Sequence, residues 1–420
     1  NSTCIRKYSR LRRPDGGIRL MDPTTIVIFC FLGMLGLLAL KVPVGFGMLI
    51  VGTIGFALLK TPFIALLIIP RIVFEQTANY NHVILPLFMV TGAFVMKADV
   101  APAAFEFARR CVGHLRGGMA MATVVTCALF GACTGSSIAT SLTIGRITIP
   151  EMKRHGHSDA LACGTIAAAG TLGMLIPPSA MMVIYAILTE LSVIKLFMAG
   201  LVPGILSAVV YIVGIYLFAL WKPEHAGNLA KRFNWNDRLM AMRDTWGIFA
   251  LFTIVIGGIY SAIFTVTEAA GAAAVFAFFM MMAKGNRWVN IQESFIDGAR
   301  TTAVLFFLLL GAWVFSLFVA MSGVAQEVSA FILSWPFSPL VTLLIILVLY
   351  IPLGMIIDPL SMVLLTLPVI LPTVMGLGYD AIWFGVILIK MCELANITPP
   401  IGLHVFVIKG IAPPGTQVVD

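Results

Sequence analysis

Apolar segments long enough to cross a lipid bilayer recur along most of the 420-residue chain. A membrane-spanning helix needs about 20 mostly apolar residues, a run that soluble domains rarely contain. Hydrophobic residues make up 60% of the chain and charged residues 11%, whereas soluble domains are roughly 45–50% apolar and about 25% charged. The sequence therefore predicts a polytopic, all-α membrane protein with apolar segments at 24–40, 44–59, 83–97, 195–220, 246–264, 268–283 and 302–322.

Three weaker segments are predicted to lie along the membrane surface. Residues 62–75 are interrupted by Pro70-Arg71, and residues 101–116 and 286–300 mix polar and apolar positions as amphipathic helices do. The long polar loop 222–245 is rich in Lys and Arg, which predicts a cytoplasmic location. It separates a first half, 21–221, from a second half, 246–412.

Charge and motifs exclude several classes of protein. In so apolar a chain, the net charge of +8 indicates positive-inside topology and not nucleic-acid binding. The seven cysteines form no CxxC pair, and no phosphate-binding GxxxxGK[ST] loop occurs, so we expect neither a metal-binding cysteine cluster nor an ATP-driven motor. HExxH and GxSxG are also missing, so the chain is predicted not to be an enzyme.

The two ends of the chain depart from the rest. Residues 1–20 carry six basic residues and are either a cytoplasmic anchor or an extension foreign to the protein. Counting crossings back from the basic run at 109–116 places Met21 outside, which favours a non-native extension. Residues 413–420 follow the last apolar arm and form the C-terminal end.

The stretch 131–150, GACTGSSIATSLTIGRITIP, concentrates glycines and hydroxyls inside this apolar chain. Basic residues flank it on both sides, so both flanks should be cytoplasmic. Too few residues lie between the flanks for two complete spans of about 20 residues each. A re-entrant hairpin at 118–150 that turns at Thr134–Ser137 satisfies both constraints.

The second half repeats this layout without the basic flanks. No Lys or Arg occurs from Thr301 to Ile389, and a polar break at Asp358-Pro359 divides a second hairpin, 339–373. Pro150 and Pro372 each lie 27 residues before a Pro-Pro pair, which interrupts the predicted broken helices 160–189 and 382–411. Two such units with opposite charge flanks predict an inverted-topology repeat, with a re-entrant helical hairpin and a discontinuous helix in each unit.

Each repeat thus pairs a hairpin tip with a broken helix. A proline pair removes two backbone donors and frees carbonyl oxygens, which together with hydroxyls can bind a small hard cation. Half-helix N-termini favour an anionic group nearby. The predicted substrate- or cation-binding residues are Gly135, Ser136, Ser137, Thr140, Thr171, Gly173, Pro177, Pro178, Asp358, Asn396, Thr398, Pro399 and Pro400, with the cation bound by Ser136, Ser137, Asp358 and Thr398.

Simpler structural roles compete with these assignments. The hydroxyls at 136–140 could pack a helix contact. Asp358 could cap the helix that begins at Asp-Pro, and His404, in the arm after the second break, could be a packing residue.

Four motifs resemble the large membrane subunit of TRAP (tripartite ATP-independent periplasmic) transporters. They are GSSIATSLTIGRITIPEMKRHG, AAGTLGMLIPPSAMMVIYAILTELSVIKLFMAGLVPG, FTVTEAAGAAAVFAF and the region from DPLSMVLLTLPVILP to ITPPIGLHVFVIKG. The resemblance covers nearly all of 21–412. It implies a sodium-driven importer of C4-dicarboxylates, sialic acid or related carboxylates with an elevator-type motion, located in the bacterial inner membrane. It also implies two partners, a small membrane subunit and a periplasmic solute-binding protein, with Na⁺ as coupling ion and no other cofactor.

One departure from that family concerns the C-terminus. The family pattern continues past VIKGIAP into another hydrophobic span, so we expect the chain to be truncated after Asp420. Two alternatives remain open. A stand-alone carboxylate carrier, sodium- or proton-coupled, would have the same architecture, although intramembrane carboxylates and histidines are scarce for a proton relay. A passive channel is disfavoured because two breaks in an inverted repeat suit alternating access.

Overall fold

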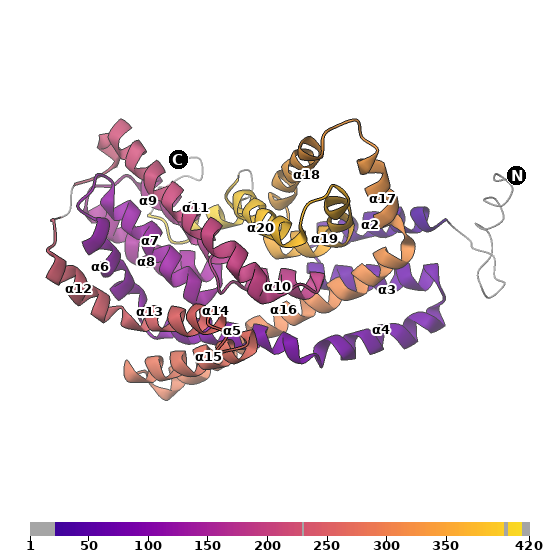
Figure 1. Cartoon of the computed structure of the whole chain (residues 1–420), viewed down its shortest axis with the longest axis horizontal. Coiled ribbons are helices and arrows are strands. Elements are labelled where there is room, and N and C mark those ends of the chain that lie inside the picture. Colours follow the sequence, from indigo (N-terminus) through magenta and orange to yellow (C-terminus); the bar gives the residue numbers. More distant parts are fainter. Residues whose placement is uncertain (1–21, 229–230, 399–401, 414–420) are drawn as a thin grey trace, which may run out of the picture. The chain divides into compact units, whose positions relative to one another are not determined.

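The computed structural model describes residues 22–228, 231–398 and 402–413, and this part of the chain is almost entirely helical (Figure 1). It contains no β-strand, and its only β-type pairing is an isolated bridge between His157 and Ala226. The all-α fold class predicted from the composition is therefore confirmed. The helices form two compact units, each built from segments of both sequence halves.

The first unit comprises residues 22–79, 304–343 and 363–379. Its elements are α2 (Pro23–Ala39), α3 (Val44–Leu59), α4 (Pro62–Thr77), the second part of α16 (Trp288–Ser322), α17 (Val324–Leu333), the start of α18 (Pro339–Gly354) and most of α19 (Pro359–Gly376).

Small residues let α3 approach α16 closely within this unit. A Cβ placed on Gly52 would lie 2.9 Å from the backbone nitrogen of Phe315, so no side chain fits there. Membrane helices use glycine in this way because close packing replaces the hydrophobic driving force that lipid cannot supply. At the helix ends, the Thr24 hydroxyl of α2 donates a hydrogen bond of 3.1 Å to Glu327 of α17.

The second unit comprises residues 80–303, 344–362 and 380–413, with the gaps given above. Its first elements are η1 (Tyr80–Val83), α5 (Ile84–Lys97), α6 (Ala101–Val112), α7 (Gly118–Thr134), α8 (Ser137–Arg154), α9 (Asp159–Gly170), η2 (Thr171–Met174), α10 (Ala180–Thr189) and α11 (Val193–Trp221). They are followed by η3 (Pro223–His225), α12 (Trp235–Asp244), α13 (Trp246–Phe252), the π-helical turn η4 (Thr253–Gly257), α14 (Gly258–Tyr260), α15 (Val266–Ala283), the start of α16, the end of α18, the start of α19, α20 (Ala381–Ile397) and α21 (Leu403–Lys409).

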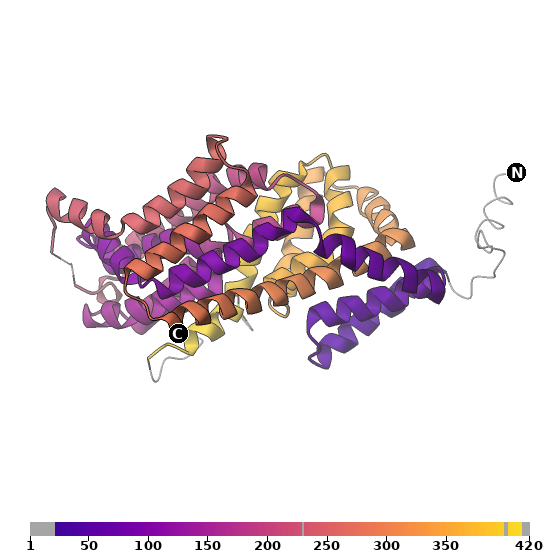
Figure 2. The same cartoon turned by 90° about the horizontal axis from the view of Figure 1, so that it is seen from below.

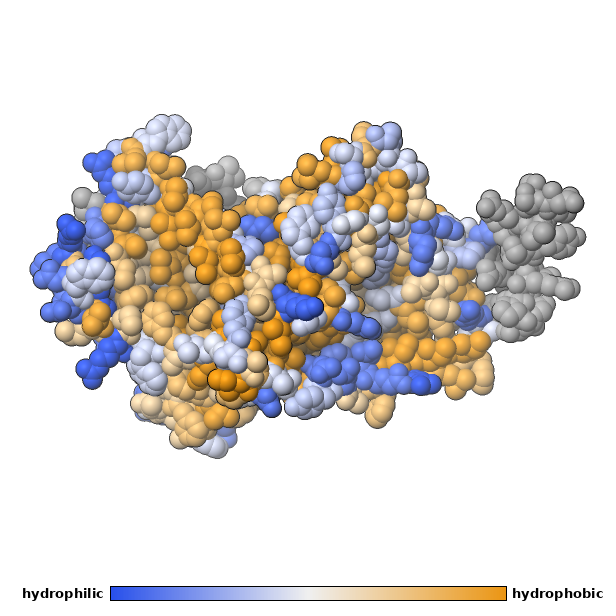
Figure 3. Space-filling model, viewed as in Figure 1, coloured by the Kyte–Doolittle hydropathy of each residue, from blue (hydrophilic) through white to orange (hydrophobic). Residues whose placement is uncertain are grey.

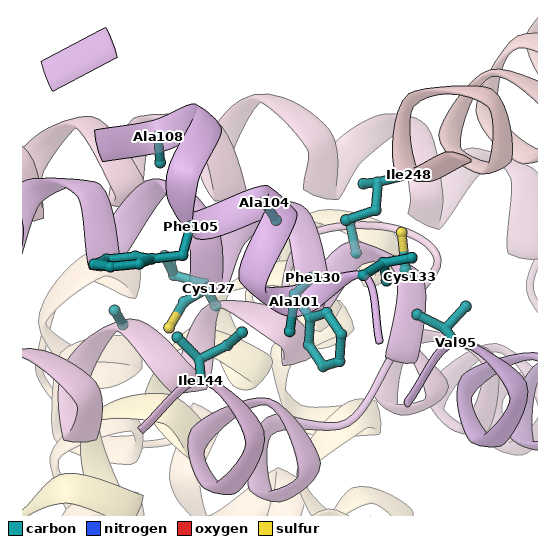
Figure 4. Close-up of a cluster of buried hydrophobic side chains, with 14 of the residues drawn as sticks. Val95, Ala101, Ala104, Phe105, Ala108, Cys127, Phe130, Cys133, Ile144 and Ile248 are labelled. Carbon is teal, nitrogen blue, oxygen red and sulfur yellow. The ribbon is translucent and has the colours of Figure 1, made fainter. Parts of the chain in front are cut away.

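Helix α7 forms the centre of the second unit, with α6, α8 and α9 packed around it. Figure 4 shows Phe130 and Cys127 of α7 among the small residues Ala101 and Ala104 of α6, with Ile144 of α8 on another side. All five side chains are at most 3% exposed. Close packing of this kind makes the environment of the first hairpin rigid.

Helices α5 and α15 pack against each other beside this core. Helices α5 and α15 lie side by side in both views (Figures 1 and 2), and Phe94 of α5 meets Phe278 of α15 edge to face at 5.6 Å between ring centroids. An ion pair of 2.8 Å joins Lys97, at the end of α5, to Glu293 of α16.

Several observed helices fall within the segments predicted as hairpins and broken helices. Helices α7 and α8 occupy the region of the hairpin 118–150, and α8 continues through Pro150 to Arg154. Helices α18 and α19, joined through residues 355–358, occupy the hairpin 339–373. The broken helix 160–189 consists of α9, η2 and α10, and the broken helix 382–411 consists of α20 and α21.

Two sequence-based boundaries differ from the structure. Residues 286–300 and 302–322 were expected to be separate segments, but α16 runs through both as one helix of 35 residues. The change from polar to apolar composition does not interrupt its hydrogen bonding, and the Thr301 hydroxyl bonds back to the carbonyl of Asp297 at 2.8 Å. Pro70 likewise lies inside α4 and does not end it.

The outer surface of the second unit suits a lipid environment. In Figure 3 the outward face of α11 is mostly apolar, and Val202, Leu206 and Leu217 are each more than half exposed. Among the described residues, four helices are long and apolar enough to cross a membrane, or up to six if each of two bent pairs forms one span. The chain is a multi-pass membrane protein.

Candidate functional site

The tip of the first hairpin is a two-residue break between α7 and α8. Gly135 has φ = 62°, a left-handed conformation that glycine adopts without strain. Ser136 is extended and caps α8, where its hydroxyl accepts a hydrogen bond from the Ala139 nitrogen at 3.4 Å. The sequence TGSS thus produces the chain reversal expected from its flanks.

This tip rests directly on the break of the first discontinuous helix. A Cβ on Gly135 would lie 3.1 Å from the carbonyl oxygen of Pro178. A Cβ on Gly131 would lie 2.8 Å from the Cα of Gly173. The glycines therefore allow backbone-to-backbone contact between α7, the tip and the segment that contains Pro177.

Hydroxyl groups are concentrated around this contact. The Thr140 hydroxyl donates to the Ser136 carbonyl at 2.8 Å and lies 3.0 Å from the Thr134 hydroxyl. Thr171, at the start of η2, donates to the Ala168 carbonyl at 2.7 Å. Thr140 and Thr171 are fully buried, and Ser137 is 8% exposed. The Thr140 and Thr171 oxygens keep lone pairs that can face a cation while their protons are donated to the backbone.

The tip of the second hairpin lies against α20. A Cβ on Gly354, at the end of α18, would collide with the Cβ of Ala395. The Pro359 carbonyl lies 3.9 Å from the sulfur of Cys392. Asp358 caps α19 and accepts a hydrogen bond of 3.0 Å from the Ser361 nitrogen through Oδ2. The capping role considered for Asp358 is thus present in the structure, and its carboxylate is half-buried.

The end of α20 brings two further predicted residues next to this tip. Asn396 is 1% exposed, and within the described part of the chain its Oδ1 has no hydrogen-bond partner. A buried polar atom without a partner costs about 1–3 kcal/mol, which makes this oxygen a candidate ligand. Thr398 ends α20 and donates to the Leu394 carbonyl at 2.5 Å. Pro399 and Pro400 lie outside the described residues.

The candidate residues therefore form two groups and not one. Ser136, Ser137, Gly173 and Pro178 meet at the first break, whereas Asp358 lies with the end of α20 at the second. No hydrogen bond among the described residues joins the two groups of side chains. The groups are linked through the helices, because α20 packs against η2 and α21 packs against α8 and α9. The Ser141 hydroxyl of α8 also lies 3.2 Å from Nδ1 of His404 in α21.

One pair of charged residues was not selected from the sequence. Lys390 and Glu393 of α20 form an ion pair of 2.7 Å, and Glu393 is 1% exposed. The Lys390 ammonium also lies 3.5 Å from the Tyr211 hydroxyl of α11. The signal was present in the segment ILIKMCELANI, where a Lys and a Glu three residues apart interrupt an apolar run.

The chemistry of both groups is that of neutral and carboxylate oxygens. No group of three or more His, Cys, Asp or Glu side chains that could hold a metal ion occurs in the described residues. Hydroxyl, amide and carbonyl oxygens suit a hard, weakly bound cation, and not a transition metal.

The chain is similar to known proteins over most of its length. The family model described as "Tripartite ATP-independent periplasmic transporter, DctM component" matches residues 31–419. The C4-dicarboxylate TRAP transporter large permease protein DctM of Pseudomonas aeruginosa is 37% identical over 340 residues, which are 80% of this chain and 79% of that protein. The sialic acid TRAP transporter large permease protein SiaM of Vibrio cholerae is 30% identical over 382 residues, 90% of this chain and 88% of that protein.

A solved structure shares the fold. The crystal structure of the YdaH transporter of Alcanivorax borkumensis, described as having an unusual topology, superimposes with a TM-score of 0.59. The match covers 83% of this chain and 82% of that chain at 15% sequence identity, so it concerns the fold alone.

Proposed function

The chain belongs to the DctM component family of tripartite ATP-independent periplasmic transporters, and we propose that it is the translocating subunit of a sodium-coupled importer of organic acids. The family makes the chain a transporter permease subunit and not an enzyme. Sodium coupling, the class of substrate and the elevator-type motion are the proposed steps beyond that.

The observation that carries the proposal is the contact of each hairpin tip with a helix end at a break. Gly135 lies against Pro178, and Gly354 lies against Ala395, one residue before Asn396. Irregular backbone at membrane depth is tolerated where protein surrounds it or water reaches it, and transporters use it to bind substrates and ions.

Sodium is the cation that best fits these oxygens. At the first break, Ser136 and Ser137 would bind Na⁺ together with carbonyl oxygens of residues 175–179. At the second break, Asp358, Asn396 and Thr398 would do so, and the Oδ1 of Asn396 would gain the partner it lacks. A single carboxylate among neutral ligands suits a monovalent ion, because divalent sites usually contain more negative charge.

The substrate is an organic acid, with a C4-dicarboxylate as the first candidate. That assignment rests on the similarity to the C4-dicarboxylate permease DctM of P. aeruginosa. Sialic acid is the second candidate substrate because the chain is also similar to SiaM. The N-terminus of α8, which Ser136 caps, presents backbone amides that favour an anionic group. Contacts within each tip and break, such as that of Gly135 with Pro178, suit alternating access by movement of one unit in an elevator-type cycle.

Two protein partners follow from the same family. A periplasmic solute-binding protein would deliver the acid to the outer face of the inner membrane, and a small membrane subunit would complete the membrane complex. Delivery by a binding protein is what distinguishes this proposal from a stand-alone carboxylate symporter.

The test is uptake into proteoliposomes that contain the full chain, its small membrane subunit and the cognate binding protein. Labelled succinate should accumulate under an inward sodium gradient and fail to accumulate under an equal potassium gradient. Omission of the binding protein should abolish uptake. Sodium-dependent uptake that does not need the binding protein would instead establish the stand-alone symporter.

A further inference from the structure

A cleft with a volume of about 660 Å³ opens between α9 and α11 in the second unit, and no residue of either hairpin tip lines it. The two helices lie next to each other in Figure 1. The walls are mostly apolar. Ser158, Lys222 and His225 lie at one end, where α9 begins and α11 ends, and Thr165 and Tyr211 lie further along. Clefts of roughly 300–1,000 Å³ are the usual size for small-molecule sites.

Small residues on both helices leave space in the cleft. A Cβ placed on Gly164 of α9 or on Gly214 of α11 would find no heavy atom within 4 Å. Ala160 and Ala168, one helical turn to either side of Gly164, also line the cleft. The volume is therefore set by small residues on both helices.

A buried hydroxyl in the cleft has no partner. Thr165 lines the cleft and is 6% exposed, yet its Oγ1 makes no hydrogen bond among the described residues. A helical threonine usually donates to the carbonyl one turn earlier, as Thr126 does to Ala122 at 2.7 Å. An orphaned buried hydroxyl is costly, so the cleft is suited to an occupant that carries a hydrogen-bonding oxygen.

The polar end of the cleft has the character of an anion site. Ser158, Lys222 and His225 line it, and α9 begins there. Because Ser158 caps the Leu161 amide at 3.3 Å, the amides of Asp159 and Ala160 are the ones that can face an anion. Asp159 and Glu224, which are sequence neighbours of Ser158 and His225, are outside the lining. Asp159 is paired with Lys153 at 3.0 Å, and Glu224 lies 3.8 Å from His225.

We propose that the α9–α11 cleft binds a phospholipid with an anionic headgroup. The phosphate lies at the start of α9 beside Lys222, and an ester oxygen meets the Thr165 hydroxyl. An acyl chain follows the apolar walls toward Val124 and Ala169. Thr165 lies seven residues, or about 10 Å along the helix, beyond Ser158, so its hydroxyl lies deeper in the cleft than the polar end.

A phospholipid fits these observations better than a transmembrane helix of another protein. The backbone groups of such a helix are satisfied internally, so it would leave the Thr165 hydroxyl and the amides of Asp159 and Ala160 without partners. The basic residues Lys153 and Arg154 precede α9, which places the polar end at the cytoplasmic leaflet by the positive-inside rule. Basic pockets between membrane helices on this side are known to suit anionic lipid headgroups.

The experiment compares dioleoyl phosphatidylglycerol with dioleoyl phosphatidylcholine, added to the purified full chain and counted by native mass spectrometry. We expect one retained phosphatidylglycerol, held at least about five-fold more tightly than phosphatidylcholine, because one lysine near a headgroup contributes about a five-fold preference. Lys222→Gln should remove that preference. Lys284→Gln is the matched control, since Lys284 also directly follows a membrane helix but lies outside the cleft.

Two variants test the body of the cleft. Gly164→Leu should fill it and abolish retention, whereas Gly33→Leu, an exposed glycine of α2 with equally open surroundings, should bind as the native chain does. Thr165→Val keeps the shape and removes the hydroxyl, and it should weaken retention even if Gly164→Leu folds poorly. Equal retention in the Gly164→Leu and Gly33→Leu proteins would overturn the proposal. Displacement of the lipid by one equivalent of the small membrane subunit would also overturn it, because the cleft would then be a helix-docking site.

Discussion

The imidazole of His404 lies against the hydroxyl of Ser141, with 3.2 Å between Nδ1 and Oγ, although 263 residues separate them in the sequence. Both side chains are fully buried. Ser141 belongs to the first hairpin and His404 to the arm after the second break, so this contact ties one repeat to the other. It lies one residue beyond Thr140, whose hydroxyl holds the first tip.

Removing this contact should destabilise the second unit. His404→Phe keeps a buried ring but leaves the Ser141 hydroxyl without that partner, at a cost of about 1–3 kcal/mol. A double-mutant cycle with Ser141→Ala, read from denaturation in detergent, should show coupling between the two changes. Ser207→Ala removes a local hydrogen bond in α11 and serves as control. Additive effects of the two substitutions would mean that the contact contributes nothing.

The ion pair of Lys390 and Glu393 predicts an asymmetric mutational response. Lys390→Met should destabilise the protein strongly, by about 3–5 kcal/mol, because the buried Glu393 carboxylate would lose its counter-charge. Adding Glu393→Leu to that variant should recover much of the loss, since neither charge then remains. Denaturation curves of the single and double variants measure this. A double variant as unstable as Lys390→Met alone would show that the pair is not the cause.

Because glycines allow close backbone contact at the first tip, we expect that adding one methyl group there reduces transport. Gly131→Ala would place a Cβ 2.8 Å from the backbone of Gly173, so one of the two segments must shift. Overpacking of this kind costs about 1–3 kcal/mol and would displace the tip from the break. Succinate uptake should fall at least about ten-fold, whereas Gly33→Ala should transport normally. Normal uptake by the Gly131→Ala protein would separate this contact from the transport path.

Glu106, in the amphipathic helix α6, pairs with Arg109 and Arg110, and we expect these ion pairs to contribute to stability in a pH-dependent way. Burial would raise the pKa of its carboxyl, but hydrogen bonds from Arg109 and Arg110 outweigh burial and hold that pKa below its usual range. The pKa is therefore lower in the folded than in the unfolded chain. The contribution is complete above the unfolded pKa of about 4.3 and is lost as the pH falls through the folded pKa.

Thermal unfolding of the native chain and of Glu106→Gln measures this contribution. The native chain should melt at a higher temperature at pH 7, and the difference should shrink below about pH 4. A difference that stays constant across this range would assign the effect to packing and not to charge.

Local signals in the sequence predicted the first tip well. Basic flanks and the TGSS motif located a reversal at 134–137, and the structure places it at Gly135 and Ser136. Composition likewise indicated the apolar helices. Each segment that crosses a bilayer must be apolar over its own length and must form its backbone hydrogen bonds internally. The predicted helix boundaries were wrong where a change in composition was taken as a helix end. In α16 the polar first part continues into the apolar second part as one helix.

Partners distant in the sequence could not be predicted in the same way. Nothing in the sequence near Ser141 indicates His404, and nothing near Gly131 indicates that Gly173 will approach its backbone. Lys390 and Glu393 were visible as charges in an apolar run, but their pairing and the approach of Tyr211 depend on how α20 meets α11. Such contacts follow from tertiary packing and not from periodicity.

The second tip makes Asn396 the most informative single residue for sodium binding. Its Oδ1 is buried without a partner, so a bound cation would satisfy it. Asn396→Leu removes that oxygen and should raise the sodium concentration needed for half-maximal uptake at least about ten-fold, the effect of losing a ligand worth about 1.4 kcal/mol. Asn290→Ala, in the amphipathic part of α16, is the control. An unchanged sodium dependence in the Asn396→Leu protein would remove this residue from the cation site.

The most direct measurement is the simultaneous entry of radioactive sodium and labelled succinate into proteoliposomes containing the complete membrane complex. The account predicts that sodium enters in a fixed ratio to succinate, that entry of both requires the succinate-loaded binding protein, and that Asn396→Leu lowers both together. Succinate entry that continues without sodium, or sodium entry at the same rate with and without succinate, would contradict this account.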